Sequence, residues 1–550
     1  MTKKDNKISR KITFLLFSIL FLVGLFTFKD YGISVDEEFQ RASGFYWLNY
    51  VLSFTSFENF KSSVAEISSQ IKGFTLSPPA IYNYYGVVFD LPVAFLEVAF
   101  QIEEPKNYFY FRHLLGFFLF FIASIYFYKL LLNRFSNYYV SLIGVLFFIL
   151  SPRIYGSSFF NNKDIVFLSL LTIALYYCFK ALEKPNFKNF LIFSVFAALG
   201  VSLRVFGIFF PILFIIFYLL SFLSNNKNLS NLFNLIFFFI FFFVFLIIFW
   251  PFLWSNPFEN FVFALQQFSD HPLKTKMLFF GEYIDSNFLP YLYIFTWIFI
   301  STPILYIILF LVGYIQIFKR FFSRFINITD TKYYYDLWRG VNEKKDLFIL
   351  FSITSAIFYL IAFNANLYNG WRQIYFLNIF IIYISIVAFY QIDIYFKRKF
   401  RKNFHYYVTI FFLFSVVYKM IVYHPFQNIY FNNYFNKISH LNFEIDYYGL
   451  SGKKFLKEIL TLEKNKNVIK IGVASWLPLE RSIKLLDKKE RKRIKIIGGN
   501  FENADYLYTN FISEIDKNSD DKYEIPDNFT KIDEFILNNI TVYQVFKKNN

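Results

Sequence analysis

Three consecutive acidic residues, Asp36, Glu37 and Glu38, follow the first apolar segment of the chain, and Arg41 comes shortly after them. A carboxylate can take a proton from a hydroxyl group, so this group could take part in general acid–base chemistry. Acidic residues also favour the start of a helix, because the helix dipole is positive there. The acidic group therefore allows a catalytic and a structural interpretation.

Basic side chains that could bind an anion occur at separate places along the chain, usually next to other polar residues. They are Arg112-His113, Arg153, Asn162-Lys163-Asp164, Arg204, Asp270-His271 and Trp371-Arg372. Taken singly, an arginine could instead anchor lipid head groups, and a histidine could be structural. Charged groups at a membrane boundary are costly unless they are paired or solvated, so their convergence on one face would indicate function.

Long apolar helices must position these residues, since 56% of the 550 residues are hydrophobic and only 17% are charged. Apolar runs of about 17 to 25 residues are long enough to cross a bilayer. We predict roughly eleven membrane-spanning helices, near 12–28, 108–131, 138–151, 164–182, 188–203, 205–222, 231–252, 290–317, 348–363, 374–392 and 404–421. The first of them follows a basic start but precedes no small-x-small cleavage site, so we expect it to be retained.

Lysine and arginine residues in the loops predict the topology, because short cytoplasmic loops are enriched in them. The clusters that we place inside are Lys129 with Arg134, Lys180 with Lys184 and Lys188, Lys319 with Arg320 and Arg324, and Lys397 to Lys402. The N-terminus is then cytoplasmic, and the polar residues described above all lie on the outer face. A span at Ala80–Phe100 would reverse every later loop, so we place this segment on the outer surface, within a long external loop over 28–107.

The remainder of the chain predicts a small α/β domain, which gives a transmembrane domain over 1–423 and an extracytoplasmic domain over 424–550. Strands are expected at Val468–Ser475, Ile494–Gly498, Asp505–Thr509 and Ile540–Phe546, with helices near Gly452–Leu462 and Leu479–Leu486. The fold class is thus an all-α polytopic membrane protein with a C-terminal α/β domain.

Charge and cysteine content exclude some classes of protein and site. The net charge of +17 is spread over short loops and forms no patch or stripe, which argues against nucleic acid as a partner. Cys178 is the single cysteine, so neither an intramolecular disulfide nor a cysteine-rich metal site is possible.

Several segments in order along the chain resemble a known family. Asp36-Glu37 after the first helix resembles the acidic pair of the protein O-mannosyltransferases and the lipid A aminoarabinose transferases, which are polyprenyl-phosphate-sugar-dependent glycosyltransferases of the GT-C fold. The other segments with this resemblance are Tyr110–Leu114, Ser151–Asp164, Leu289–Pro303, Tyr368–Gln373, His424–Asn432 and Phe443–Ser451. Gln373 and Asn162 depart from the bacterial members, many of which have histidine and proline at these positions.

The resemblance implies transfer of a monosaccharide from a polyprenyl-phosphate donor to an acceptor at the outer face of a bacterial inner membrane, by an inverting reaction. Asp36 would be the general base, and Glu37 and Asp164 would complete the catalytic group. Arginine and lysine side chains suit a lipid phosphate, whose charge must be stabilised as it leaves. The residues implied to bind the lipid phosphate or the sugar are Arg41, Arg112, His113, Arg153, Lys163, Arg204, Trp371 and Arg372.

The resemblance implies no cofactor, because the mannosyltransferase-like branch uses no metal, although carboxylates could bind a divalent ion. The expected partners are a polyprenyl-phosphate-linked sugar, membrane lipids, and a lipid, glycan or protein acceptor. Two other functions stay open from the residues alone. A flippase or scaffold for polyprenyl-linked glycans would share the cavity but would not need Asp36. A secondary transporter would place charges at the bilayer midplane and usually has two related halves, which we do not find.

Overall fold

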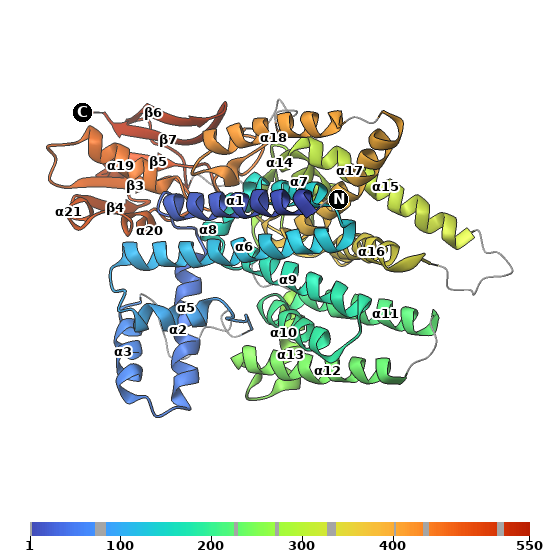
Figure 1. Ribbon diagram of the computed structural model, residues 1–550. Coiled ribbons are helices and arrows are strands. Elements are labelled where there is room, and N and C mark those ends of the chain that lie inside the picture. The colour runs from blue at the N-terminus through green and yellow to red at the C-terminus, as the bar shows by residue number, and fades with distance from the viewer. Residues whose placement is uncertain are drawn as a thin grey trace.

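A computed structural model describes residues 3–71, 84–224, 229–269, 274–326, 337–400, 403–432, 439–513 and 522–549. Asp270-His271 lies outside these residues. Figure 1 shows long helices running side by side, with the C-terminal strands at one end of them, and α1 beginning away from those strands. This is the arrangement expected for a bundle of membrane spans that carries a soluble domain on one face.

Nine helices within the described ranges are long and apolar enough to cross a membrane. They are α1 (Lys3–Thr27), α6 (Pro105–Phe135), α9 (Asp164–Glu183), α11 (Phe209–Ser224) with the preceding turn η1 (Val205–Ile208), α12 (Leu229–Phe249), α15 (Ile304–Ile326), α16 (Gly340–Ala362), α17 (Leu377–Lys399) and α18 (Phe404–Val422). Each overlaps a span predicted from the sequence, so a multi-pass membrane protein is confirmed.

The two remaining predicted spans are also helical. The pair α7 (Tyr138–Ile149) and α8 (Pro152–Phe160) is bent by 60° where Pro152 lacks the N–H that would continue the helix. The helix α10 (Phe187–Leu203) is apolar but has only 17 residues.

The predicted span at 290–317 is wrong in its first part. The chain there forms α14 (Tyr293–Ser301) and then breaks at Pro303 before α15. Asn432 supports the break, because its side-chain amide donates a hydrogen bond to the carbonyl of Thr302 at 3.0 Å. An apolar run shows where a span can lie, but the proline decides where the helix begins.

In the described residues between α1 and α6, the long loop holds three short helices, α2 (Glu37–Ser53), α3 (Glu58–Ser69) and α5 (Asp90–Ala99). In Figure 1, α2 and α3 run across the direction of the long helices. The described part of Ala80–Phe100 contains α5, whose ten residues are too few to span a bilayer. Further along the chain come α13 (Pro257–Ser269) and a hairpin of β1 (Lys276–Phe279) and β2 (Glu282–Asp285).

The C-terminal domain contains a five-stranded mixed sheet in the order β4-β3-β5-β7-β6. Its strands are β3 (Ile469–Val473), β4 (Ile494–Gly498), β5 (Tyr506–Thr509), β6 (Phe529–Leu537) and β7 (Ile540–Lys548), and its helices are α19 (Gly452–Leu462), α20 (Glu480–Ile483) and α21 (Lys488–Arg491). The fold class predicted from the sequence is confirmed. The edge strand β6 was not predicted, because charged and exposed residues interrupt its apolar alternation.

The C-terminal domain is docked on the loop that precedes Asp36. Gly32 packs so closely there that an added Cβ would lie 2.5 Å from the carbonyl oxygen of Leu450. Lys453 donates hydrogen bonds to the carbonyl oxygens of Lys29 and Asp30 at 2.6 and 3.0 Å. This docking fixes the backbone that leads from α1 to the acidic group.

Candidate active site

Asp36 forms an ion pair with Arg372, which comes from the short turn η3 (Arg372–Ile374) before α17. The side chain of Asp36 is 40% exposed, whereas that of Arg372 is 5% exposed. Burial disfavours the charged form of Arg372, but Asp36 and the nearby phenols outweigh it and raise its pKa well above the ordinary value. The pair therefore presents an accessible carboxylate held by a permanently charged guanidinium.

A second ion pair joins Asp164, at the start of α9, to Arg204, which links α10 to η1. Asp164 is buried. Asn161 holds its carboxylate in place by donating a hydrogen bond to Oδ2 at 3.0 Å, and accepts one from the backbone N–H of Asp164 at 2.9 Å. The position of Asp164 is thus set by the turn between α8 and α9.

Two tyrosines connect these ion pairs. The hydroxyl of Tyr448 accepts a hydrogen bond from Asn161 at 2.8 Å, and its ring lies 5.6 Å from the guanidinium of Arg372. Burial raises the pKa of Tyr368. The charges of both ion pairs also shift this pKa: Arg372 and Arg204 lower it, and Asp36 and Asp164 raise it. The loop after α1 and the 151–164 loop therefore meet around one polar site.

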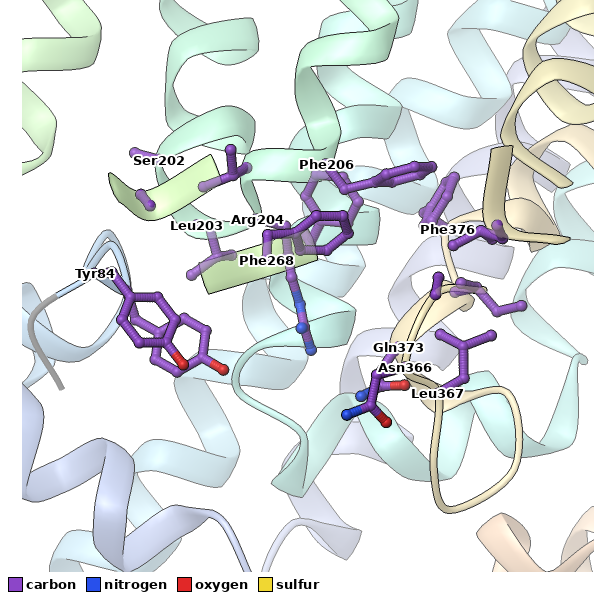
Figure 2. Close-up of a pocket in the computed structure, with 17 residues that line it drawn as sticks. Tyr84, Ser202, Leu203, Arg204, Phe206, Phe268, Asn366, Leu367, Gln373 and Phe376 are labelled. Atoms are coloured by element: carbon purple, nitrogen blue, oxygen red, sulfur yellow. The ribbon is translucent and has the colours of Figure 1, made fainter. Parts of the chain in front are cut away.

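A small, mostly apolar pocket of ≈ 60 Å³ lies beside this site, and Arg204 is among the residues that line it. Figure 2 shows the guanidinium of Arg204 extending toward Asn366 and Gln373, with the rings of Phe206, Phe268 and Phe376 around the other part of the pocket. A pocket with aromatic walls and one cationic group suits a ligand that has an apolar chain and an anionic head.

Lys163 adds a further cation at the same place. It precedes α9, and its ammonium group lies over the ring of Tyr85, which also lines the pocket. Burial and the nearby Arg204 lower the pKa of Lys163, while Asp164 and Asp36 oppose this shift. Three cationic side chains from different parts of the chain, Lys163, Arg204 and Arg372, thus gather near two carboxylates.

Other predicted site residues lie in buried contacts that hold the helices together. Glu37 and His113 are both fully buried, with Oε1 and Nε2 3.0 Å apart, which ties α2 to α6. Arg41 donates from Nε to both carboxylate oxygens of Glu97, at 3.0 and 3.1 Å. These contacts position the acidic loop and do not line the pocket.

The same is true of Arg112, Arg153 and Trp371. Arg112 forms a buried ion pair with Asp90 of α5. Arg153 donates a hydrogen bond from Nε to the carbonyl oxygen of Tyr430 at 2.9 Å. The indole N–H of Trp371 donates to the hydroxyl of Ser301 at 2.8 Å, which fixes the residue next to Arg372.

Glu444 is a buried carboxyl group near the site that the sequence did not single out. Asn369 donates a hydrogen bond to it at 3.3 Å. Burial raises the pKa of Glu444 to about 8, with Asn369 and Arg372 opposing the shift. Among the residues that the structure describes, no three His, Cys, Asp or Glu side chains are arranged to hold a metal ion.

The raised pKa of Glu444 predicts a pH-dependent stability. Between the ordinary pKa of 4.5 and about 8, the folded protein binds more protons at this group than the unfolded chain does. The free energy of unfolding should therefore fall as pH rises from 5 to 8, by an amount on the order of a few kcal/mol. Glu444→Gln removes this titration, so the Tm of the purified variant should fall less than that of the wild type over the same range. Equal falls would exclude Glu444 as the cause.

Comparisons with known proteins found a family and a solved structure with similarity to this chain. Residues 112–254 match the family model described as dolichyl-phosphate-mannose-protein mannosyltransferase. No curated protein sequence matches the chain. Among solved structures, the crystal structure of ArnT from Cupriavidus metallidurans bound to undecaprenyl phosphate is similar, with a TM-score of 0.43, 10% identity and 97% of each chain covered.

The matched segment contains three residues of the polar site, Lys163, Asp164 and Arg204. Its match confirms the resemblance that the sequence predicted: residues 112–254 of this chain are similar to the dolichyl-phosphate-mannose-protein mannosyltransferase family.

Proposed function

We propose that the protein is a membrane glycosyltransferase that moves a monosaccharide from a polyprenyl-phosphate donor to a hydroxyl group of an acceptor. The proposal rests on one observation: two ion pairs, Asp36–Arg372 and Asp164–Arg204, lie beside an aromatic pocket. The donor class comes from the matched family, which is named for mannose linked to dolichyl phosphate, a polyprenyl phosphate.

The aromatic walls of the pocket would contact the part of the polyprenyl chain that lies next to the phosphate. The phosphate would then lie at Arg204, with Lys163 and Arg372 close enough to share its charge. Charge-assisted hydrogen bonds from a guanidinium are the strongest that a side chain can offer to a phosphate. Since the lipid phosphate leaves with a negative charge, these cations would stabilise the leaving group without a proton donor.

Asp36 would act as the general base. It would take the proton from the acceptor hydroxyl as that oxygen bonds to the anomeric carbon, and the bond from this carbon to the phosphate oxygen would break with its electrons leaving on the phosphate. A single displacement of this kind inverts the configuration at the anomeric carbon. The exposed side of Asp36 is available to an acceptor, while Arg372 holds the carboxylate from the buried side.

The basic loops orient the proposed reaction on the outer face of the membrane, with a cytoplasmic N-terminus. The acceptor could be a lipid, a glycan or a protein, and the C-terminal domain lies next to the loop that carries Asp36. Its Lys484 contacts Glu38 at 2.5 Å. We infer that this domain forms one side of the acceptor entrance.

Arg372→Ala tests the donor part of this proposal. Loss of one charge-assisted partner should weaken binding of a polyprenyl-phosphate sugar about 10- to 100-fold, measured with a labelled donor and purified protein. Arg398→Ala is the matched control, because this arginine is exposed at the end of α17 and should leave binding unchanged. Full donor affinity in Arg372→Ala would remove this residue from the phosphate site.

A further inference from the structure

A second groove lies between α1 and α6 and shares no residue with the candidate active site. Phe14, Phe17 and Phe21 line it from α1, and Phe118, Phe121 and Ile125 line it from α6. Ring contacts join its walls, with centroids 6.0 Å apart for Phe17 and Phe121 and 5.3 Å for Phe21 and Phe121. Phe14 and Phe118 are nevertheless 76% and 45% exposed, so both walls of the groove have rings that face outward.

Two cations lie at one end of this groove, Arg10 on α1 and Lys129 on α6. The two helices are antiparallel, so a residue near the start of α1 and one near the end of α6 lie at the same height along the helix axes. Both side chains are exposed, and within the described part of the chain neither forms an ion pair with a carboxylate. Thr13 donates a hydrogen bond to the hydroxyl of Tyr128 at 3.2 Å, which joins the helices just inside this charged end.

The length of the groove matches one leaflet of a bilayer. Phe21 comes eleven positions after Arg10, and Lys129 comes eleven positions after Phe118. At about 1.5 Å per residue, each wall runs for roughly 16 Å, which is about half of a hydrocarbon core of about 30 Å. A single acyl chain that starts at the membrane surface covers this distance.

We propose that the α1–α6 groove binds one anionic membrane phospholipid, with its phosphate between Arg10 and Lys129 and an acyl chain along the phenylalanine side chains. The charged end lies where α1 begins, whereas Asp36 follows the end of α1, so the groove opens at the opposite face of the membrane from the candidate active site. The occupant is therefore a lipid of the other leaflet and not the donor of the proposed reaction. This inference does not depend on the proposed function.

Binding of added lipids to the full-length protein in detergent, followed by native mass spectrometry, tests the proposal. Phosphatidylglycerol should bind more tightly than phosphatidylcholine with the same acyl chains. Removal of both cations in R10Q/K129Q should weaken phosphatidylglycerol binding about 10- to 30-fold, since each cation near a lipid surface contributes about 1 kcal/mol. The same substitutions should change phosphatidylcholine binding little.

K319Q/R398Q is the matched control, because it removes two exposed cations from the ends of α15 and α17 that belong to loops of the same predicted face. Phosphatidylglycerol binding that is retained in this control and lost in R10Q/K129Q supports the site. Equal binding of the two lipids by the wild type would overturn the proposal. So would an equal loss in the two double variants, because the effect would then be general charge attraction.

Discussion

Asp36→Asn is expected to lower sugar transfer about 10²- to 10⁴-fold, which is the usual contribution of a general base. The substitution keeps the size of the side chain and leaves an amide oxygen that can accept a hydrogen bond from Arg372, but it removes the basicity needed to take a proton. Because Arg372 is only 5% exposed, the change also leaves a buried guanidinium without its carboxylate and should lower stability, so thermal unfolding is measured beside activity. The measurement is transfer of labelled sugar from a defined polyprenyl-phosphate donor by purified protein, together with donor binding.

Glu38→Gln is the matched control for Asp36→Asn. It makes the same chemical change two residues away, where the carboxylate faces Lys484 and Arg481 of the C-terminal domain. This partly exposed ion pair is worth at most about 1 kcal/mol, so transfer should stay close to the wild-type rate. If Asp36→Asn transfers sugar at the normal rate, Asp36 is not the base. If it fails to transfer and also fails to bind the donor, its role is in binding.

Arg204→Ala should lower both stability and donor binding. Asp164 is 4% exposed at its side chain, so removal of Arg204 leaves a buried carboxylate without its cation, which typically costs about 3–5 kcal/mol. Donor affinity should fall about 10- to 100-fold, because Arg204 is the cationic side chain among the described residues that line the pocket. Thermal unfolding and binding of a labelled donor measure the two effects separately.

The double variant Asp164→Asn/Arg204→Ala separates the two roles of Arg204. Without a buried charge on residue 164, the stability lost in Arg204→Ala should be largely recovered. Donor affinity should stay low, because the phosphate still lacks its guanidinium. Recovery of both stability and affinity in the double variant would show that Arg204 only neutralises Asp164 and does not bind donor.

The charged part of the site could be predicted from the sequence, because charges are rare in a membrane protein and their positions stand out. Asp36, Lys163, Asp164, Arg204 and Arg372 do gather around one polar site. Periodicity and charge could not show which cations face the pocket and which form ion pairs elsewhere in the bundle. The sequence does not distinguish Arg112 from Arg204. In the structure, however, Arg112 forms an ion pair with Asp90 of α5.

Features that depend on uncharged residues, or that arise only in the folded structure, were harder to predict. Asn161 and Tyr448 connect the two ion pairs, but neither carries a charge that would distinguish it from many other asparagines and tyrosines. The break at Pro303 and the bend at Pro152 depend on local backbone sterics within runs that hydropathy treats as continuous. Glu444 has a raised pKa only because folding buries it, which no local pattern records.

The three consecutive carboxylates contact three separate parts of the molecule: Asp36 pairs with Arg372 before α17, Glu37 with His113 on α6, and Glu38 with Lys484 in the C-terminal domain. During synthesis, Asp36 is made 336 residues before Arg372, and the C-terminal domain follows later still. A nascent chain already inserted in the membrane therefore carries the acidic residues without two of their three partners. The acidic loop acquires its final geometry only in the last stage of biogenesis, when the soluble domain folds against the completed bundle.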